Sequence, residues 1–330
     1  MRRIICSSIV FMMAMVLAAV GVKYESGGGA GLGMDSAVIV TLNTGDAKLF
    51  KGKIISGTDG HMIIFNQDGT VYCEYTDIPL NWLSVYEPEN LVIAASWGNG
   101  PLLIELDDDW TVKRKETIPA PKKPDTTLID PTLIKANDTY ILSYIEIEGK
   151  INNGAPGTEN GVYTVKCMES GNLKDWVSLS DILSCKKNME DADMVFQDGK
   201  LYYFFEKEEY DKGPSSINVI ISEDHGQSWQ KETELLAAAA DQELASVEAA
   251  EDGYLLYYSS DIDAPGTSYD GAKIYLASFT RDFQLRSTHE VDIGESKGIL
   301  LYDTKRASEG VYYLYARNYC KENNLVLHIR

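Results

Sequence analysis

The sequence predicts an all-β protein built as a single β-propeller, and three observations lead to this prediction. Helical periodicity is nearly absent after residue 36, where the one candidate helical turn is Leu235–Asp241. Short runs rich in Val, Ile, Tyr and Leu alternate with turns of Asp, Asn and Gly, which is the pattern of strands and hairpins. These strand pairs recur along the chain, so the sequence has an internal repeat.

Each repeat consists of a strand, a polar turn and a Tyr-rich strand. Successive turns are 49, 60, 54 and 57 residues apart. A period near 50 in an all-strand sequence is typical of propeller blades, and second hairpins such as 166–176 and 219–229 raise the count to four strands per blade. We therefore predict five blades; residues 35–76 carry about three more strands, which leaves six blades as the alternative. The five turns are Glu89, Asp138, Asp198, Asp252 and Glu309.

The last repeat has three clear strands before the end of the chain, so we expect an N-terminal strand to complete it. The candidates are Ala37–Leu42 and Thr70–Tyr75. Such closure removes the exposed edge that an open sheet would present. We also expect Cys73 and Cys320 to lie in neighbouring strands where the two ends meet.

The N-terminus has the features of an export segment. Met1-Arg2-Arg3 precedes an apolar run over 4–22, which fits a signal peptide and is also just long enough to span a bilayer. Residues 1–24 are therefore a signal peptide or a membrane anchor, 25–36 a Gly-rich linker, and 37–330 the propeller domain. We expect a secreted or extracytoplasmic protein that contacts a membrane only through its N-terminal segment.

Charge and cysteine content exclude several partners. The net charge of −20 repels nucleic acid and anionic lipid, so nucleic acid is not expected as a partner. The cysteines form no C-x-x-C motif and no cluster with histidine, so we expect no metal centre and no cofactor. An axial Ca²⁺ held by oxygen ligands stays open, although no ligand spacing indicates one. A monomer is expected.

Residues Ser222–Trp229 read S-E-D-H-G-Q-S-W. They resemble the Asp box, S-x-D-x-G-x-[ST]-W, which occurs in sialidases and several other propeller families. The chemistry of the motif is local, because Asp224 can accept hydrogen bonds within the turn and Gly226 can adopt a conformation that other residues avoid. The motif therefore indicates the fold rather than the activity, and we expect it at the periphery of its blade.

A second resemblance concerns activity. Residues Ile129–Tyr144 carry Asp130-Pro131 at the start of an inner strand, then a turn and a Tyr-rich strand. This arrangement resembles glycoside hydrolase family 43, the five-bladed arabinanases and β-xylosidases, and at the level of blades the resemblance covers roughly 80–330. In that family three equivalent inner-strand positions hold a base Asp, an Asp that tunes the acid, and a general acid Glu.

Counting nine residues back from the second turn residue of each repeat gives Asn81, Asp130 and Glu190. The resemblance implies that Asp130 is the tuning Asp and Glu190 the general acid. The first position departs from the family, because Asn81 cannot take a proton from water. Asp77, four residues earlier, is the candidate substitute, and Asp191 and Asp193 lie beside Glu190 as further carboxylates.

Trp82 and Trp97 flank the first predicted blade, where they could stack on a sugar ring beside Asn81 or simply pack between blades. A sialidase is less favoured, because that class holds its carboxylate substrate with three arginines and opens with an Arg-Ile-Pro-like motif that this sequence lacks. We expect a glycoside hydrolase-like propeller acting on a neutral oligo- or polysaccharide. The alternative, favoured by Asn81, is a non-catalytic propeller that binds carbohydrate, or protein through its Asp-box scaffold.

Overall fold

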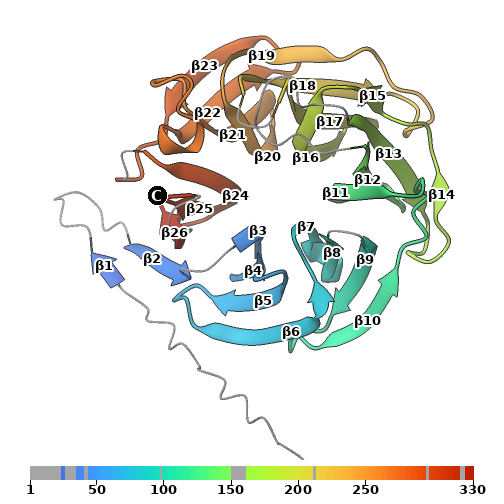
Figure 1. Cartoon of the computed structure of the whole chain (residues 1–330), viewed down its shortest axis with the longest axis horizontal. Helices are drawn as coiled ribbons and strands as arrows, with labels where there is room; N and C mark the ends of the chain where they lie inside the picture. Colours follow the sequence, from blue (N-terminus) through green and yellow to red (C-terminus); the bar gives the residue numbers. More distant parts are fainter. Residues whose placement is uncertain are drawn as a thin grey trace, which may run out of the picture.

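The computed structural model describes residues 24–26, 35–40, 44–96, 99–149, 161–210, 213–294, 297–319 and 324–330. These residues form six antiparallel sheets arranged as blades around a central axis (Figure 1). The prediction of an all-β propeller is confirmed. The prediction of five blades is wrong, and the alternative of six is correct.

In blades 1, 2, 4 and 5 the strands are hydrogen-bonded in chain order; in blade 3 the last two strands both pair with the third, and in blade 6 two N-terminal strands are added at the outer edge. The first strand of each blade named below is nearest the axis (Figure 1). Blades 1 to 3 comprise β3 (Thr44–Phe50), β4 (Lys53–Thr58), β5 (His61–Asn66) and β6 (Val71–Pro79); β7 (Trp82–Tyr86), β8 (Leu91–Ser96), β9 (Asn99–Leu106) and β10 (Val112–Thr117); and β11 (Thr126–Ala136), β12 (Thr139–Glu148), β13 (Val162–Ser170), β14 (Val177–Ser178) and β15 (Leu183–Cys185).

Blades 4 to 6 continue the ring, and the sixth also takes two strands from the N-terminal part of the chain. They comprise β16 (Asn188–Gln197), β17 (Lys200–Glu208), β18 (Ser215–Ser222) and β19 (Thr233–Ala240); β20 (Gln242–Ala250), β21 (Gly253–Ser260), β22 (Lys273–Thr280) and β23 (Leu285–Glu290); and β24 (Ile299–Ala307), β25 (Gly310–Arg317), β26 (Asn324–Ile329), β2 (Asp35–Val40) and β1 (Tyr24–Ser26). Two short 3-10 turns, η1 (Glu87–Glu89) and η2 (Ser268–Asp270), lie outside the strands.

Blade 1 was not recognised from the sequence, because its strands were considered either as extra strands or as candidates for closing the last blade. Residues 44–79 form a complete four-stranded sheet, whose inner hairpin turns at Lys51 and Gly52 with φ of 46° and 74°. Closure uses β2, which pairs with β26 through Ala37 and Leu327. Of the two predicted closing segments, 37–42 therefore overlaps the strand that closes the ring, and 70–75 overlaps β6 of blade 1.

The repeat itself was read correctly. All five predicted turns lie between the first and second strands of their blades, in the innermost hairpins. The candidate helical turn at Leu235–Asp241 is wrong, because residues 233–240 form β19, the outer strand of blade 4. Alanine-rich sequence adopts a strand here because β18 supplies the hydrogen-bonding partner, and tertiary pairing outweighs local helix propensity.

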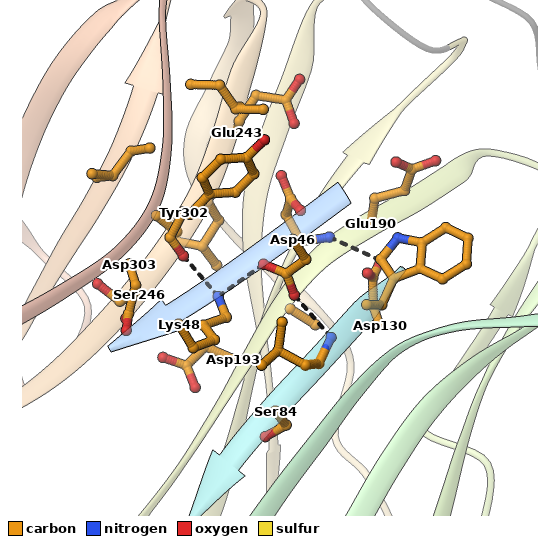
Figure 2. Close-up of a pocket in the computed structure, with 18 of the residues that line it drawn as sticks. Asp46, Lys48, Ser84, Asp130, Glu190, Asp193, Glu243, Ser246, Tyr302 and Asp303 are labelled. Carbon is orange, nitrogen blue, oxygen red and sulfur yellow. Dashed lines mark hydrogen bonds and ion pairs between the residues drawn. The ribbon is translucent and has the colours of Figure 1, made fainter. Parts of the chain in front are cut away.

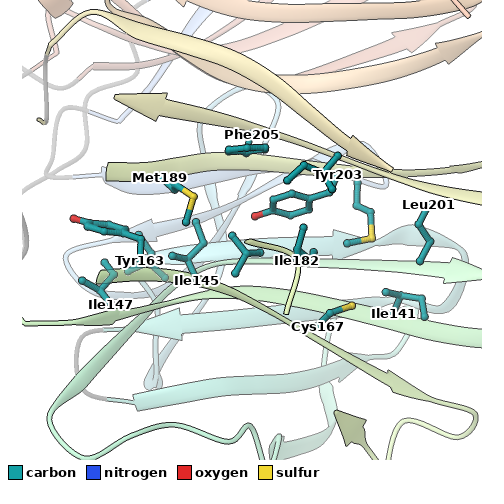
Figure 3. Packing of buried hydrophobic residues seen from close by; sticks show 14 of the residues in the cluster. Ile141, Ile145, Ile147, Tyr163, Cys167, Ile182, Met189, Leu201, Tyr203 and Phe205 are labelled. Carbon is teal, nitrogen blue, oxygen red and sulfur yellow. The ribbon is translucent and has the colours of Figure 1, made fainter. Parts of the chain in front are cut away.

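The core is divided into six apolar clusters, each lying between two neighbouring blades. Figure 3 shows the cluster between blades 3 and 4, where Ile145 and Tyr163 pack against Met189, Tyr203 and Phe205. Each large side chain buried in this way contributes about 1.5–3 kcal/mol relative to exposure. Packing between blades therefore holds the inner strands at the axis, where the functional groups converge.

The predictions for the two ends of the chain can be compared with the structure only in part. The N-terminal segment 1–23 and Cys320 lie outside the described residues. Within those residues, no helix has the length and apolarity needed to cross a membrane. Cys73 is a free thiol on β6 of blade 1, whereas the ring closes between β2 and β26, so the expectation that Cys73 lies at the closure is wrong.

Candidate active site

The inner strands of all six blades converge on one axial cavity of about 260 Å³. Neighbouring inner strands contact each other in the order β3, β7, β11, β16, β20, β24 and back to β3. Blades 1 and 4 therefore lie on opposite sides of the axis. The cavity is strongly acidic, because its described lining has one lysine, Lys48, and seven carboxylates: Asp46, Asp130, Glu190, Asp191, Asp193, Glu243 and Asp303 (Figure 2).

β-Bulges bring these carboxylates to the axis. Asp130-Pro131 and Asp191-Ala192 each occupy a position where two residues oppose one on the second strand. Asp130 and Asp191 adopt left-handed φ angles of 44° and 48°, a conformation that Asp tolerates better than most residues. A bulge redirects side chains locally, and proline fits at such an irregularity because no ladder hydrogen bond is needed from its nitrogen.

Three of the cavity carboxylates connect neighbouring blades. Each accepts one hydrogen bond from the next backbone N–H of its own strand and one from the inner strand of the following blade, and we call this set the clamp carboxylates. The acceptors and donors are Asp46 with Ala47 (2.7 Å) and Leu83 (2.9 Å), Asp193 with Met194 (2.8 Å) and Val247 (2.7 Å), and Asp303 with Thr304 (2.9 Å) and Leu49 (2.8 Å).

Lys48 lies among the clamp carboxylates and offsets part of their charge (Figure 2). Its Nζ donates to the carbonyl of Tyr302 at 2.7 Å and lies 4.0 Å from Asp46 Oδ1. Burial lowers the pKa of Lys48, but Asp46, Asp303 and Asp193 raise it by more, so Lys48 stays charged. Burial raises the pKa of Asp46, while Lys48 and the two backbone donors act in the opposite direction.

Asp130, Glu190 and Asp191 form a second group of acids between blades 3 and 4. Asp130 Oδ2 accepts a hydrogen bond from the backbone N–H of Asp191 at 3.2 Å. Glu190 Oε1 accepts one from Asn188 Nδ2 at 3.0 Å. The pKa of Asp130 is raised well above its usual value, first by burial and then by the charges of Asp191, Glu190 and Asp46. This group therefore retains a proton at pH values where an isolated Asp has lost it.

The residues predicted from sequence fall into three groups. Asp130, Glu190 and Trp82 line the cavity. Asn81 precedes β7 outside the cavity lining, and its backbone N–H donates to the carbonyl of Ala95 at 2.8 Å. Trp97 lies outside the described residues.

Asp77 requires a correction. It lies on β6, the outer strand of blade 1, where its side chain is 71% exposed and pairs with Lys115 of β10. It therefore cannot reach the axis. The carboxylate that blade 1 brings to the cavity is Asp46, which the sequence analysis missed because blade 1 was not recognised. The signal was present: Asp46 lies shortly before the Lys51-Gly52 turn, as Asp193 lies before the Asp198-Gly199 turn.

The nine-residue count that equated Asp130 with Glu190 is wrong by one residue in blade 4. Ala136 pairs with Thr139 at the end of the hairpin of blade 3, and Gln197 pairs with Lys200 in blade 4. Measured from these pairs, Asp191 rather than Glu190 is equivalent to Asp130, and these two share the bulge and the left-handed φ. Glu190 is one residue earlier and still lines the cavity.

The Asp box occupies the connection between β18 and β19, and none of its residues lines the axial cavity. Asp224 accepts hydrogen bonds from the hydroxyl of Ser222 at 2.8 Å, and from the backbone N–H and the hydroxyl of Ser228 at 2.8 and 2.6 Å. Gly226 has a φ of 87°. These contacts account for the motif by turn chemistry alone, as expected.

Comparison with known proteins identifies solved structures that share the propeller fold. No protein-family model matches the sequence, and no curated protein sequence matches it. The structure is similar to an α-L-arabinanase of Penicillium chrysogenum complexed with arabinobiose, with a TM-score of 0.59 and 12% identity over 93% of this chain and 98% of that one. The propeller fold is shared.

Two further solved structures are similar. A Trypanosoma rangeli sialidase in complex with the inhibitor DANA gives a TM-score of 0.56 at 12% identity, over 88% of this chain and 55% of the sialidase. An α-L-arabinofuranosidase from Lactobacillus brevis gives 0.53 at 15% identity, over 75% of this chain and 89% of that one. At these identities the likeness shows the fold, and the chemistry has to be argued from the cavity.

Proposed function

We propose that this chain is a glycoside hydrolase-like propeller that acts on a neutral oligo- or polysaccharide. The observation that supports this most directly is the pair of acidic groups on opposite sides of the axial cavity. Asp46 belongs to blade 1, and Glu190 belongs to blade 4, three blades away in a ring of six. Hydrolysis of a glycosidic bond normally needs two carboxyl groups that flank the scissile bond.

The roles follow from the environments of the two groups. Glu190 is the proposed general acid, because it lines the cavity opposite Asp46 and acts on Asp130, whose pKa burial and the charges of Asp191 and Glu190 raise well above its usual value. Asp130 is the neighbour that helps to keep the proton in place. Asp46 replaces Asp77 as the proposed base or nucleophile, because it is the carboxylate that blade 1 brings to the cavity. Burial raises the pKa of Asp46, and Lys48 acts in the opposite direction.

The charge of the cavity supports a neutral substrate. Its described lining contains no arginine, and Lys48 already serves the clamp carboxylates. A carboxylated sugar would be repelled by such a field. Trp82 offers an aromatic surface at the cavity on which a sugar ring could stack, and Trp97 is kept as a second proposed contact. Export through residues 1–24 would bring a monomeric protein to polysaccharides outside the cytoplasm.

The alternative is a propeller that binds carbohydrate without cleaving it. One observation favours it: both carboxylate oxygens of Asp46 accept backbone hydrogen bonds, so Asp46 has a structural role that requires no catalysis. The two functions differ in turnover, because a binding protein would retain the sugar and release no product.

The test is a screen of the purified chain on arabinan, xylan and aryl glycosides, with binding to the same sugars measured in parallel. We expect release of reducing sugar, and we expect Glu190→Gln and Asp46→Asn each to lower kcat at least about a hundredfold. Asp198→Asn is the matched control, because Asp198 lies at the exposed turn of the same hairpin as Glu190. Binding without turnover, or full activity of Glu190→Gln, would refute the hydrolase proposal.

A further inference from the structure

A second acidic cluster lies between blades 4 and 5, and it shares only Asp191 with the acids of the proposed hydrolysis. Its centre is Glu206 on β17. The carboxylate oxygens of Asp191, Glu206 and Glu243 lie within 4.8 Å of one another, and the same holds for those of Glu206, Glu208 and Asp241. Glu206 belongs to both groups, so it links two triplets of carboxylates that come from three strands and one strand boundary.

The cluster is buried to an extent that is unusual for carboxylates. Glu206 is 2% exposed, Asp241 5% and Glu208 6%. Glu206 Oε2 is fully buried and has no hydrogen-bond partner among the described residues. Such an oxygen normally loses several kcal/mol of hydration free energy when nothing replaces the water. The unpaired oxygen of Glu206 therefore points to a ligand that is not part of this chain.

The neighbouring charges show what that ligand must supply. The charged groups that act on Glu206 are all acidic, namely Glu208, Asp191, Asp241 and Glu190. No ion pair of Glu206 or Glu243 with lysine or arginine is found in the described part of the chain. Nearby lysines have other partners, since Lys207 pairs with Glu232. Carboxylates therefore surround Glu206, and no ion pair found in the described residues offsets its charge.

We propose that this cluster binds a Ca²⁺ ion between blades 4 and 5, with Glu206 as the central ligand. Ca²⁺ takes six to eight oxygen ligands at about 2.3–2.6 Å, and two oxygens on one such ion lie up to about 5 Å apart, as the measured spacing requires. Oxygen-only ligation favours Ca²⁺ over zinc, which prefers nitrogen and sulfur ligands. The ion can enter from the axial cavity, because Asp191 and Glu243 line that cavity as well as the cluster.

This inference goes beyond the proposed hydrolysis and does not depend on it. A Ca²⁺ ion at Glu206 would join β17 of blade 4 to β20 of blade 5, so its first consequence is on stability. Binding is measured without sugar, so failure of the hydrolase proposal would leave the Ca²⁺ result unchanged. Asp191 belongs to both sites, so the variants are made at Glu206 and Glu243, which the proposed hydrolysis does not use.

The experiment uses the full chain after EDTA treatment. Isothermal titration with CaCl₂ should show one saturable site, and the melting temperature should rise with Ca²⁺. Glu206→Gln keeps the size of the side chain and removes its charge, so it should bind Ca²⁺ at least about tenfold more weakly. In EDTA this variant should melt no lower than the unsubstituted protein, because an unpaired buried charge has been removed.

Glu146→Gln is the matched control. Glu146 is 3% exposed on β12, but its carboxylate accepts the backbone N–H of Lys123 at 2.6 Å and lies 3.7 Å from Lys166 Nζ. The Glu146→Gln variant should have a lower melting temperature and an unchanged affinity for Ca²⁺. If Glu206→Gln does not fold, Glu243→Gln replaces it with the same expected loss of affinity. Absence of a saturable Ca²⁺ site at millimolar concentration, or unchanged affinity in both cluster variants, would overturn the proposal.

Discussion

Replacing Asp303 by Asn tests the clamp carboxylates quantitatively. Asp303 on β24 connects blade 6 to blade 1, because its Oδ2 accepts the backbone N–H of Leu49 at 2.8 Å. Its Oδ1 accepts the N–H of Thr304 at 2.9 Å. Asparagine keeps the shape but has one oxygen acceptor in place of two and carries no charge. The lost hydrogen bond affects stability equally at all pH values, so the pH-dependent part of the difference isolates the cost of ionising a carboxylate in this cavity.

The magnitude follows from the pKa of Asp303, which burial raises from 3.8 to about 7 even though Lys48 lowers it. A raised carboxylate pKa means that the folded state holds the proton more tightly than the unfolded state. Stability from this group is therefore complete below about pH 4 and is lost as pH rises through about 7. At about 1.4 kcal/mol per pK unit this shift corresponds to about 4.5 kcal/mol, and we expect about 2–4 kcal/mol because Asp303 is not fully buried.

The assay is urea unfolding, followed by tryptophan fluorescence, of the unsubstituted protein and of Asp303→Asn between pH 4.5 and 8. The free energy of unfolding of the variant minus that of the unsubstituted protein should increase across this range. Titration of the other cavity acids is common to both proteins and largely cancels in the difference. Asp138→Asn, at an exposed hairpin turn, serves as the control and should show no such trend. A difference that stays constant with pH, or decreases, would refute the reasoning.

Two further predictions concern residues away from the cavity. Asp224→Ala should lower the melting temperature, because three hydrogen bonds of the Asp box are lost, while activity per folded molecule stays unchanged; a selective loss of activity would contradict the structural role. Hydrogen bonds from Ser228 and Ser222 lower the pKa of Asp224, so the stability difference should disappear as pH falls below about 4. Cys167 is 2% exposed and burial raises its pKa to about 12; it should not react with a thiol reagent in the native protein at pH 8, and rapid native labelling that is lost in Cys167→Ser would contradict this.

Several features of this protein are determined by residues that are close together in the sequence. Alternating apolar residues and polar turns identify hairpins, and their repetition identifies a propeller. All five predicted turns lie in innermost hairpins. The Asp box could be understood from eight residues, because Asp224 and Gly226 act within a single turn. Asp130 and Glu190 could be placed at the axis because each lies at a regular distance before such a turn.

Other features depend on contacts between distant segments, which no local pattern encodes. The number of blades depended on which N-terminal strand pairs with β26, and that choice separated Asp46 at the axis from Asp77 on an outer strand. The one-residue difference between Glu190 and Asp191 arises from a bulge against β17. Glu206 and Asp241 meet only because blades 4 and 5 pack side by side. Side-chain direction in a strand alternates with each residue, so a single bulge or a single pairing choice decides which carboxylates share a site.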